Sequence, residues 1–157
     1  MSLHHSVGFL QTHIGVLAVE VKGDSLVKVQ LVSFPLETHS PSFALALCLA
    51  QLEEYFSGER ESFDLPITLE GTDFQKKVWE ATDKIPHGEV LTYAQIAEKI
   101  GHPKAVRAVG TALGFNPVPV VIPCHRVLPS SGGVGNYAWG SNIKESLLRH
   151  ENYRVVS

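Results

Sequence analysis

The sequence lacks the features that would place this protein in a membrane, outside the cell or around a metal ion. It has no run of about 18 apolar residues, the length of a membrane span, and its N-terminus has no basic region followed by an apolar one. Only two cysteines, Cys48 and Cys124, occur in 157 residues, and no CxxC spacing is present. This argues against a disulfide framework and a zinc site. We therefore expect reduced thiols, no metal, no membrane partner, and a cytoplasmic location, or a nuclear one in a eukaryotic host.

The sequence also lacks the excess of positive charge that is typical of nucleic-acid-binding proteins, since its formal net charge is −3. The deficit is uneven along the chain. Residues 1–65 hold three Lys/Arg against eight Asp/Glu, a net −5, whereas residues 66–157 hold ten against eight, a net +2. This asymmetry is compatible with DNA contact through the C-terminal part. A solvated acidic face in the N-terminal part would produce the same charges.

The hydrophobic pattern predicts an α+β fold that begins with a small N-terminal domain of structural role over residues 1–65. Three segments rich in Val, Ile and Leu are separated by turn signals and predict an antiparallel β-sheet: Ser6–Leu10, Ile14–Val21 and Leu26–Val32. From Ser42 to Phe56, apolar residues recur at helical spacing. Cys48 lies on the apolar face of this helix, so we assign its thiol to packing. Glu61–Leu65 is a candidate short strand.

Residues 66–157 are predicted to form a mainly helical C-terminal domain. Thr72-Asp73-Phe74-Gln75 and Thr92-Tyr93-Ala94-Gln95 are capping boxes, each of which opens a helix. A glycine ends the second of these helices, and Pro103 is placed as the first residue of the next one, which runs to about Phe115. Two helices joined by a short turn that contains glycine form a helix-turn-helix.

The outer face of the predicted helix 103–115 carries mostly small residues. They are Arg107, Gly110, Thr111 and Gly114. A glycine inside a helix costs about 1 kcal/mol relative to alanine, so two of them on one face indicate a surface that lies very close to another body. The residues alone leave open whether that body is another helix of this protein or a partner.

The segment that follows this helix contains the strongest candidate for chemistry. After Asn116-Pro117, an extended apolar run over Val118–Ile122 is predicted to lead to Pro123-Cys124-His125-Arg126-Val127. The thiolate is the reactive form of cysteine, and nearby positive charge lowers the pKa of a thiol, so Cys124 is a candidate nucleophile. From residue types alone, a buried structural cysteine remains the slightly better interpretation.

Ser141 is predicted to cap a last helix through His150.

Five segments change this balance: Gly88-Glu89-Val90-Leu91-Thr92-Tyr93, Arg107-Ala108-Val109-Gly110, Asn116-Pro117, Pro123-Cys124-His125-Arg126-Val127 and Gly135-Asn136-Tyr137. Together they resemble the O6-alkylguanine-DNA alkyltransferases, which repair alkylated guanine by moving the alkyl group to their own cysteine. The resemblance covers about the last eighty-five residues closely and the first part only in general layout.

This resemblance implies an irreversible, stoichiometric transfer of the alkyl group, chiefly methyl, from O6-alkylguanine, and from O4-alkylthymine, to Cys124. The substrate is a base flipped out of double-stranded DNA that the protein binds through the minor groove. It also implies a monomer that needs no cofactor. The catalytic residues would be Cys124, His125, Glu151, Asn116 and Tyr93; the DNA-binding residues Arg107, Tyr93, Thr92, Gly110, Thr111 and Gly114; and the pocket residues Val127, Tyr137, Ala138 and Trp139.

Within the resembling family, each of these roles has a specific form. His125 would act as the base, through a water because successive residues of an extended segment point opposite ways. Glu151 would orient His125, and Asn116 would link the recognition helix to the cysteine segment. Tyr93 would rotate the target nucleotide outward and donate its hydroxyl to the leaving guanine. Arg107 would fill the gap left in the base stack.

Two other functional classes stay open at this point. The first is an alkyltransferase-like damage sensor that binds the flipped base without reacting, but such relatives replace the cysteine that this chain has. The second is a Cys-His hydrolase or a sequence-specific regulator. A regulator is expected to carry base-reading side chains along its recognition helix, and the Gly/Ala/Thr face offers almost none. Trp139 stands where some members of the resembling family have glycine and others a bulky residue, which predicts a preference for small alkyl groups; the alternative is an indole that packs outward or stacks on a bound benzyl ring.

Overall fold

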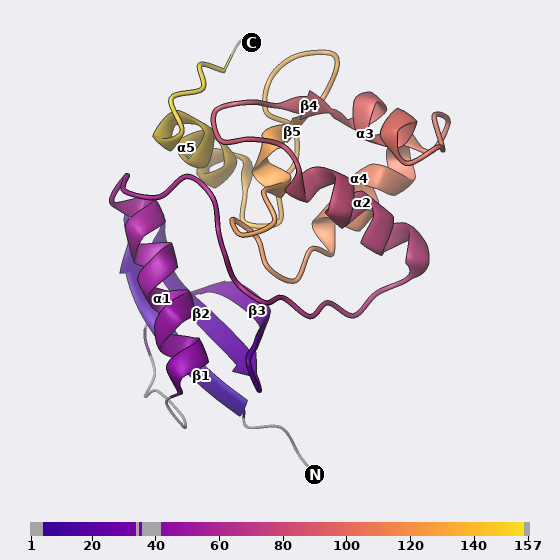
Figure 1. The fold of residues 1–157 in the computed structure, drawn as a ribbon. Helices are drawn as coiled ribbons and strands as arrows, with labels where there is room; N and C mark the ends of the chain where they lie inside the picture. Colours follow the sequence, from indigo (N-terminus) through magenta and orange to yellow (C-terminus); the bar gives the residue numbers. More distant parts are fainter. Residues whose placement is uncertain (1–4, 34, 36–41, 156–157) are drawn as a thin grey trace. The chain divides into compact units, whose positions relative to one another are not determined.

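The computed structural model describes residues 5–33, 35 and 42–155 of the chain (Figure 1). It divides into two compact units, Met1–Leu69 and Glu70–Ser157. Among the described residues, none of the helices combines the length and the hydrophobicity needed to cross a membrane.

The first unit is an antiparallel sheet with one helix on its face (Figure 1). In chain order its elements are β1 (His5–Thr12), β2 (Gly15–Lys22), β3 (Ser25–Val32) and α1 (Phe43–Phe56), and the strand order is β1-β2-β3. The side chain of Ser42 caps α1 by accepting the Leu45 N–H at 3.1 Å. The sheet and the helix confirm the sequence prediction. Cys48 lies on the buried side of α1, where burial raises the pKa of its thiol to about 11.

The predicted strand over Glu61–Leu65 is wrong. The chain crosses to the sheet edge slightly later, where Ile67 forms a parallel bridge with Leu26. The side chain of Gln51 explains the difference, because its amide donates to the Asp64 carbonyl at 3.1 Å and its carbonyl accepts the Asp64 N–H at 2.9 Å. A helix side chain thus satisfies the backbone groups that a strand partner would otherwise have to satisfy.

The second unit contains most of the helices and a short parallel strand pair. In chain order its elements are α2 (Asp73–Asp83), β4 (Leu91–Thr92), α3 (Tyr93–Lys99), α4 (Val106–Gly114), the 3-10 helix η1 (Cys124–Arg126), β5 (Val127–Leu128) and α5 (Ser141–His150). Both predicted capping boxes are present: Thr72 with Gln75 opens α2, and Thr92 with Gln95 opens α3. β4 pairs with β5 in parallel, so the start of α3 lies beside the segment that follows Cys124.

The helices α2, α3 and α4 pack on one another, and α3 and α4 form the predicted helix-turn-helix (Figure 1). The buried indole of Trp79 in α2 donates a hydrogen bond to the Ala112 carbonyl in α4 at 2.8 Å. Pro103 is not the first residue of α4, because the Ala105 N–H bonds the His102 carbonyl in a turn and the helix begins only at Val106. Such shifts of an element end are common when propensity alone places it.

The ends of two further segments also differ from the sequence prediction. α5 includes Ser141 as its first residue, and its N-cap is Gly140 with φ of +99°. The run before the cysteine is a tight turn and not an extended strand: Val120 has φ of +76°, and the Ile122 N–H bonds the Val118 carbonyl at 3.0 Å. The turn returns the chain toward the end of α4, so that Cys124 lies near Asn116, the second residue after this helix.

Candidate active site

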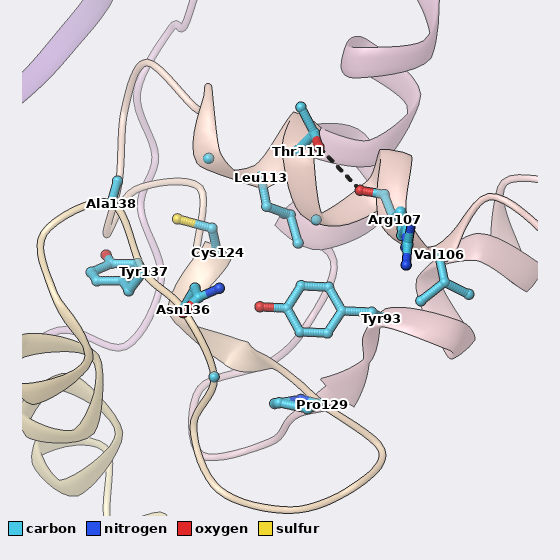
Figure 2. Close-up of a pocket in the computed structure, with 13 residues that line it drawn as sticks. Tyr93, Val106, Arg107, Thr111, Leu113, Cys124, Pro129, Asn136, Tyr137 and Ala138 are labelled. Carbon is cyan, nitrogen blue, oxygen red and sulfur yellow. Dashed lines mark hydrogen bonds between the residues drawn. The ribbon is translucent and has the colours of Figure 1, made fainter.

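A cavity of about 610 Å³ opens between α3, α4, η1 and the loop that precedes α5 (Figure 2). Thirteen residues line it: Tyr93, Val106, Arg107, Gly110, Thr111, Leu113, Gly114, Cys124, Pro129, Gly135, Asn136, Tyr137 and Ala138. One cavity therefore contains the predicted nucleophile, the small-residue face of α4 and the Tyr137–Ala138 turn.

Asn116 holds the thiol of Cys124 close to the end of α4. Its side-chain amide donates to Cys124 Sγ at 3.2 Å and to the Ile122 carbonyl at 2.8 Å, while its own carbonyl accepts the Val118 N–H at 3.0 Å. Asn116 is therefore bound to both ends of the turn that precedes the cysteine. The link to α4 is made by the backbone, because the Asn116 N–H bonds the Leu113 carbonyl at 3.2 Å.

The buried thiol of Cys124 is subject to opposing influences on its pKa. Burial raises the pKa, because it disfavours the thiolate. Hydrogen bonds from Asn116 and Tyr137 and the positive charge of Lys144 act in the opposite direction. The net effect keeps the resting group a thiol, so the site needs a base to form the thiolate.

His125 and Arg126 are both held by the buried carboxylate of Glu151. His125 Nε2 lies 2.8 Å from Glu151 Oε2, and Arg126 donates through Nε and Nη2 to the two oxygens at 2.8 and 2.9 Å. Arg126 Nη1 also donates to the Ile85 carbonyl at 2.6 Å. Burial opposes ionisation of Glu151, but the hydrogen bonds and charges of His125 and Arg126 outweigh burial and hold its pKa well below the usual range.

This arrangement corrects two of the sequence arguments. Arg126 is committed to Glu151 and is not the cation that lowers the pKa of the Cys124 thiol. His125 lies in a 3-10 turn, so the alternation expected of an extended segment does not apply to it. Burial lowers the pKa of His125, which favours the neutral imidazole despite the nearby carboxylate. Its Nδ1 is buried without a hydrogen-bond partner among the described residues.

Lys144 is the functional candidate that the sequence analysis missed. Its side chain is only 1% exposed, and Nζ donates to the Tyr93 hydroxyl at 3.3 Å and to the Asn136 carbonyl at 3.2 Å. Burial lowers the pKa of Lys144 to about 8, and the charge of Cys124 opposes this effect. A signal was present in the sequence, because Lys144 precedes Leu147 and Leu148 by three and four residues and so occupies the apolar face of α5.

Tyr93 lies at the start of α3 with its hydroxyl inside the cavity (Figure 2). Burial, and then the nearby charge of Cys124, raise the pKa of its phenol. A methyl group placed on Gly110 would lie at an ordinary contact distance of 3.7 Å from the Tyr93 ring, and one placed on Gly114 would meet no protein atom within 4 Å. The glycines of α4 are therefore not required by packing inside this protein.

Six of the predicted site residues do not line the cavity: Asn116, His125 and Glu151, described above, and Val127, Thr92 and Trp139. Val127 is buried in β5, opposite Leu91 of β4, and Thr92 caps α3. Trp139 packs edge to face against Tyr137, with ring centroids 6.0 Å apart. Trp139 thus contacts a residue that lines the cavity but does not line the cavity itself.

The fold and the cavity define a helix-turn-helix protein with a buried, hydrogen-bonded thiol close to the end of α4. Residues 73–153 match the family model of the 6-O-methylguanine DNA methyltransferase DNA binding domain, and residues 6–69 match that of its ribonuclease-like domain. The chain belongs to the 6-O-methylguanine DNA methyltransferase family.

Individual relatives agree with this assignment. The methylated-DNA--protein-cysteine methyltransferase of Methanosarcina barkeri is 57% identical over 101 residues, which are 64% of this chain and 64% of that protein. The chain thus matches somewhat less than two thirds of that relative's length. The crystal structure of Mycobacterium tuberculosis O6-methylguanine methyltransferase has a TM-score of 0.86 at 36% identity, covering 98% of this chain and 96% of the other. The structure of Mycobacterium tuberculosis OGT in complex with DNA has a TM-score of 0.83 at 40% identity, with 91% and 90% covered.

Proposed function

We propose that this protein repairs DNA by transferring the alkyl group of O6-alkylguanine, chiefly methyl, and that of O4-alkylthymine, to Sγ of its own Cys124. It acts as a monomer on double-stranded DNA in the cytoplasm, or in the nucleus of a eukaryotic host. The observation that carries the proposal is the cavity in which the Cys124 thiol, the Tyr93 hydroxyl and the Arg107 face of α4 meet. The N-terminal unit has a structural role in this account.

DNA binds the protein with the minor groove of the duplex lying along α4. The glycines of this helix have no packing role inside the protein, and Gly114 borders open space. This favours the second of the two interpretations of the small-residue face, contact with a partner. A base that is stacked in a duplex cannot reach Cys124, so it must be flipped into the cavity. Tyr93 guides the nucleotide outward, and Arg107 takes its place in the stack.

The thiolate forms by proton transfer to His125. Glu151 is an anion, so it accepts a hydrogen bond from His125 Nε2 and fixes the tautomer in which Nδ1 is the free acceptor. A water between Sγ and Nδ1 carries the proton from the thiol to the imidazole. The imidazolium that results is stabilised by the Glu151 carboxylate, whose second interaction with Arg126 keeps it ionised and oriented.

Transfer then forms the S–C bond as the C–O6 bond breaks, and the guanine departs with an extra electron pair. The Tyr93 hydroxyl donates its proton to this leaving group, and Lys144 Nζ, 3.3 Å from the Tyr93 oxygen, returns a proton to Tyr93. The thiolate and the ammonium group become a neutral thioether and a neutral amine, so the charges cancel. A pKa of about 8 makes Lys144 a proton donor near neutral pH.

The product is a thioether, and none of the described side chains of the cavity offers chemistry that would cleave it. Each protein molecule therefore acts once, without a cofactor. A damage sensor without chemistry is not favoured, because Cys124 is present with a base and hydrogen-bond donors around it.

The DNA side of the reaction provides a direct test. A duplex with one O6-methylguanine is mixed with increasing amounts of protein, and the O6-methylguanine left in the digested DNA is measured. We expect one lesion to be lost for each protein molecule added, and none with Cys124→Ser, which is expected to bind the duplex still. Loss of many lesions per molecule, or repair by Cys124→Ser, contradicts the proposal.

A further inference from the structure

Large apolar side chains are rarely exposed in the part of the chain that the structure describes. The most exposed of them are Phe43 (85%), Leu47 (37%), Val106 (39%) and Phe115 (66%). The first two lie on α1 of the N-terminal unit. The two of the C-terminal unit stand at opposite ends of α4, Val106 as its first residue and Phe115 as its C-cap. Single exposed apolar residues are normal, but this pair brackets the face that the proposed function assigns to DNA.

Phe115 continues the row of side chains that begins with Arg107. Residues four apart in a helix lie on the same side, so Arg107, Thr111 and Phe115 form one row along α4. The backbone supports this placement, because Phe115 has φ of −97° and ψ of 6°, close to helical values, and its N–H bonds the Ala112 carbonyl at 3.1 Å. Eight residues of helix place the Phe115 backbone about 12 Å from that of Arg107.

We propose that Phe115 is a second DNA contact, whose ring packs on the apolar surface of sugars and base edges in the minor groove. The inference rests on the proposed function, because it requires duplex DNA along α4. The separation of about 12 Å corresponds to roughly three to four nucleotides at 3.4 Å each, so Phe115 contacts the duplex that many steps from the flipped base. Minor-groove proteins commonly combine a cation with an apolar side chain that widens or kinks the duplex.

An apolar contact has a signature that distinguishes it from a phosphate contact. Binding through Lys or Arg releases counterions, so removing such a side chain reduces the dependence of affinity on salt. Removing the Phe115 ring lowers the affinity equally at every salt concentration. It leaves the reaction of a free alkylated base unchanged, because Phe115 does not line the cavity that contains Cys124.

The experiment compares wild type, Phe115→Ala and Phe43→Ala, a control with an even more exposed phenylalanine on α1. Affinity for a duplex with one O6-methylguanine is measured by fluorescence anisotropy over a series of salt concentrations. For Phe115→Ala we expect a Kd about tenfold higher, an unchanged salt slope, and an unchanged rate with free O6-benzylguanine. Phe43→Ala should match wild type in all three measurements.

Shortened duplexes test the distance. Two duplexes are used, each cut two base pairs beyond the lesion on one side and extended on the other; on the one that lacks the Phe115 side, wild type and Phe115→Ala should bind equally. Four outcomes overturn the inference: an unchanged Kd, a reduced salt slope, an equal loss of rate on the free base, or a difference that persists on both shortened duplexes. A change in self-association without DNA, measured by sedimentation, would assign Phe115 to a contact between copies and also overturn it.

If wild type itself neither binds the duplex nor repairs it, the proposed function fails; if it does both, only the role of Phe115 is at issue.

Discussion

Replacement of Lys144 by methionine separates activity from stability, because the two should change in opposite directions. Methionine keeps an unbranched chain of similar length in the same buried space but removes the charge and the donors. The Tyr93 hydroxyl and the Asn136 carbonyl lose a hydrogen bond, and Cys124 loses the cation that lowers its pKa. A hydrogen bond to a charged group contributes about 1.5 to 3 kcal/mol, so methyl transfer should slow by between about tenfold and a hundredfold.

The stability of the folded protein should rise in the same variant. Burial lowers the pKa of Lys144 from 10.5 to about 8, and each tenfold change in acidity corresponds to about 1.4 kcal/mol, so the buried charge costs about 3 kcal/mol near pH 7. This cost compares the charged with the neutral amine in the same site, so the variant further loses only the two hydrogen bonds of the neutral amine, about 1 kcal/mol each. A net gain of about 1 kcal/mol in the free energy of unfolding is therefore expected at pH 7.

The stability and the rate of methyl transfer should each change with pH in a defined direction. Between pH 8 and 10.5 the unfolded chain still holds the Lys144 proton that the folded protein has lost, so this group makes wild type more stable as the pH rises through that window. The variant lacks this contribution, so its advantage in stability should disappear toward pH 10.5. The wild-type rate should fall above about pH 8, as Lys144 loses its proton, and the variant should lack this fall.

The assay is a single-turnover measurement with protein in excess over a methylated duplex, repeated from neutral to alkaline pH, together with urea unfolding at each pH. Lys84→Met is the matched control, because the Lys84 side chain is 76% exposed on the surface of the same unit. It should change neither quantity noticeably. A wild-type rate in Lys144→Met would refute the assigned role of the cation, and a large loss of stability at pH 7 would refute the cost of its burial.

Other variants test the remaining parts of the site. Arg107→Ala should slow repair of duplex DNA much more than reaction with free O6-benzylguanine, since only the duplex leaves a gap to fill; equal losses would make Arg107 structural. His125→Ala should slow transfer by about 10²- to 10⁴-fold with little change in DNA affinity, and raising the pH toward 8, where Lys144 still holds its proton, should restore part of the rate; an effect far below tenfold would indicate another base. Glu151→Gln should lower the free energy of unfolding by about 3 to 5 kcal/mol, because it leaves Arg126 buried without its anion. An unchanged free energy of unfolding in urea would contradict this. Trp139→Gly should free the Tyr137 ring and raise the rate with benzyl relative to methyl, and an unchanged ratio would exclude Trp139 from control of alkyl size.

Most of the cavity could be predicted from the sequence, because its residues lie in short motifs with a strong family resemblance. Cys124, Tyr93, Arg107 and Tyr137 come from segments far apart in the chain, and the structure brings all four to one cavity. The role of Lys144 was not predicted, because a single lysine in an amphipathic helix is usually interpreted as solvated. Its role depends on Tyr93 and Asn136, which only the folded chain places beside it.

The errors in the predicted elements and in the predicted role of Arg126 have the same origin. The Glu61–Leu65 segment looks like a strand by composition, but Gln51 satisfies the backbone of Asp64 from a helix. Arg126 looks like an activator of the adjacent Cys124, but the 3-10 turn directs it to Glu151, twenty-five residues later. Local patterns predict elements and candidate chemistry, whereas the partner of a buried polar group is decided by tertiary contacts.

The most direct test of the central claim is the mass of the intact protein after reaction with an excess of duplex that carries O6-methylguanine. Wild type and Cys48→Ala should each gain one methyl group per molecule and then stop, and peptide mapping should place it on Cys124. Cys124→Ser should gain none. A second methyl group, a methyl group on Cys48, or continued loss of lesions without a change in protein mass would contradict the account.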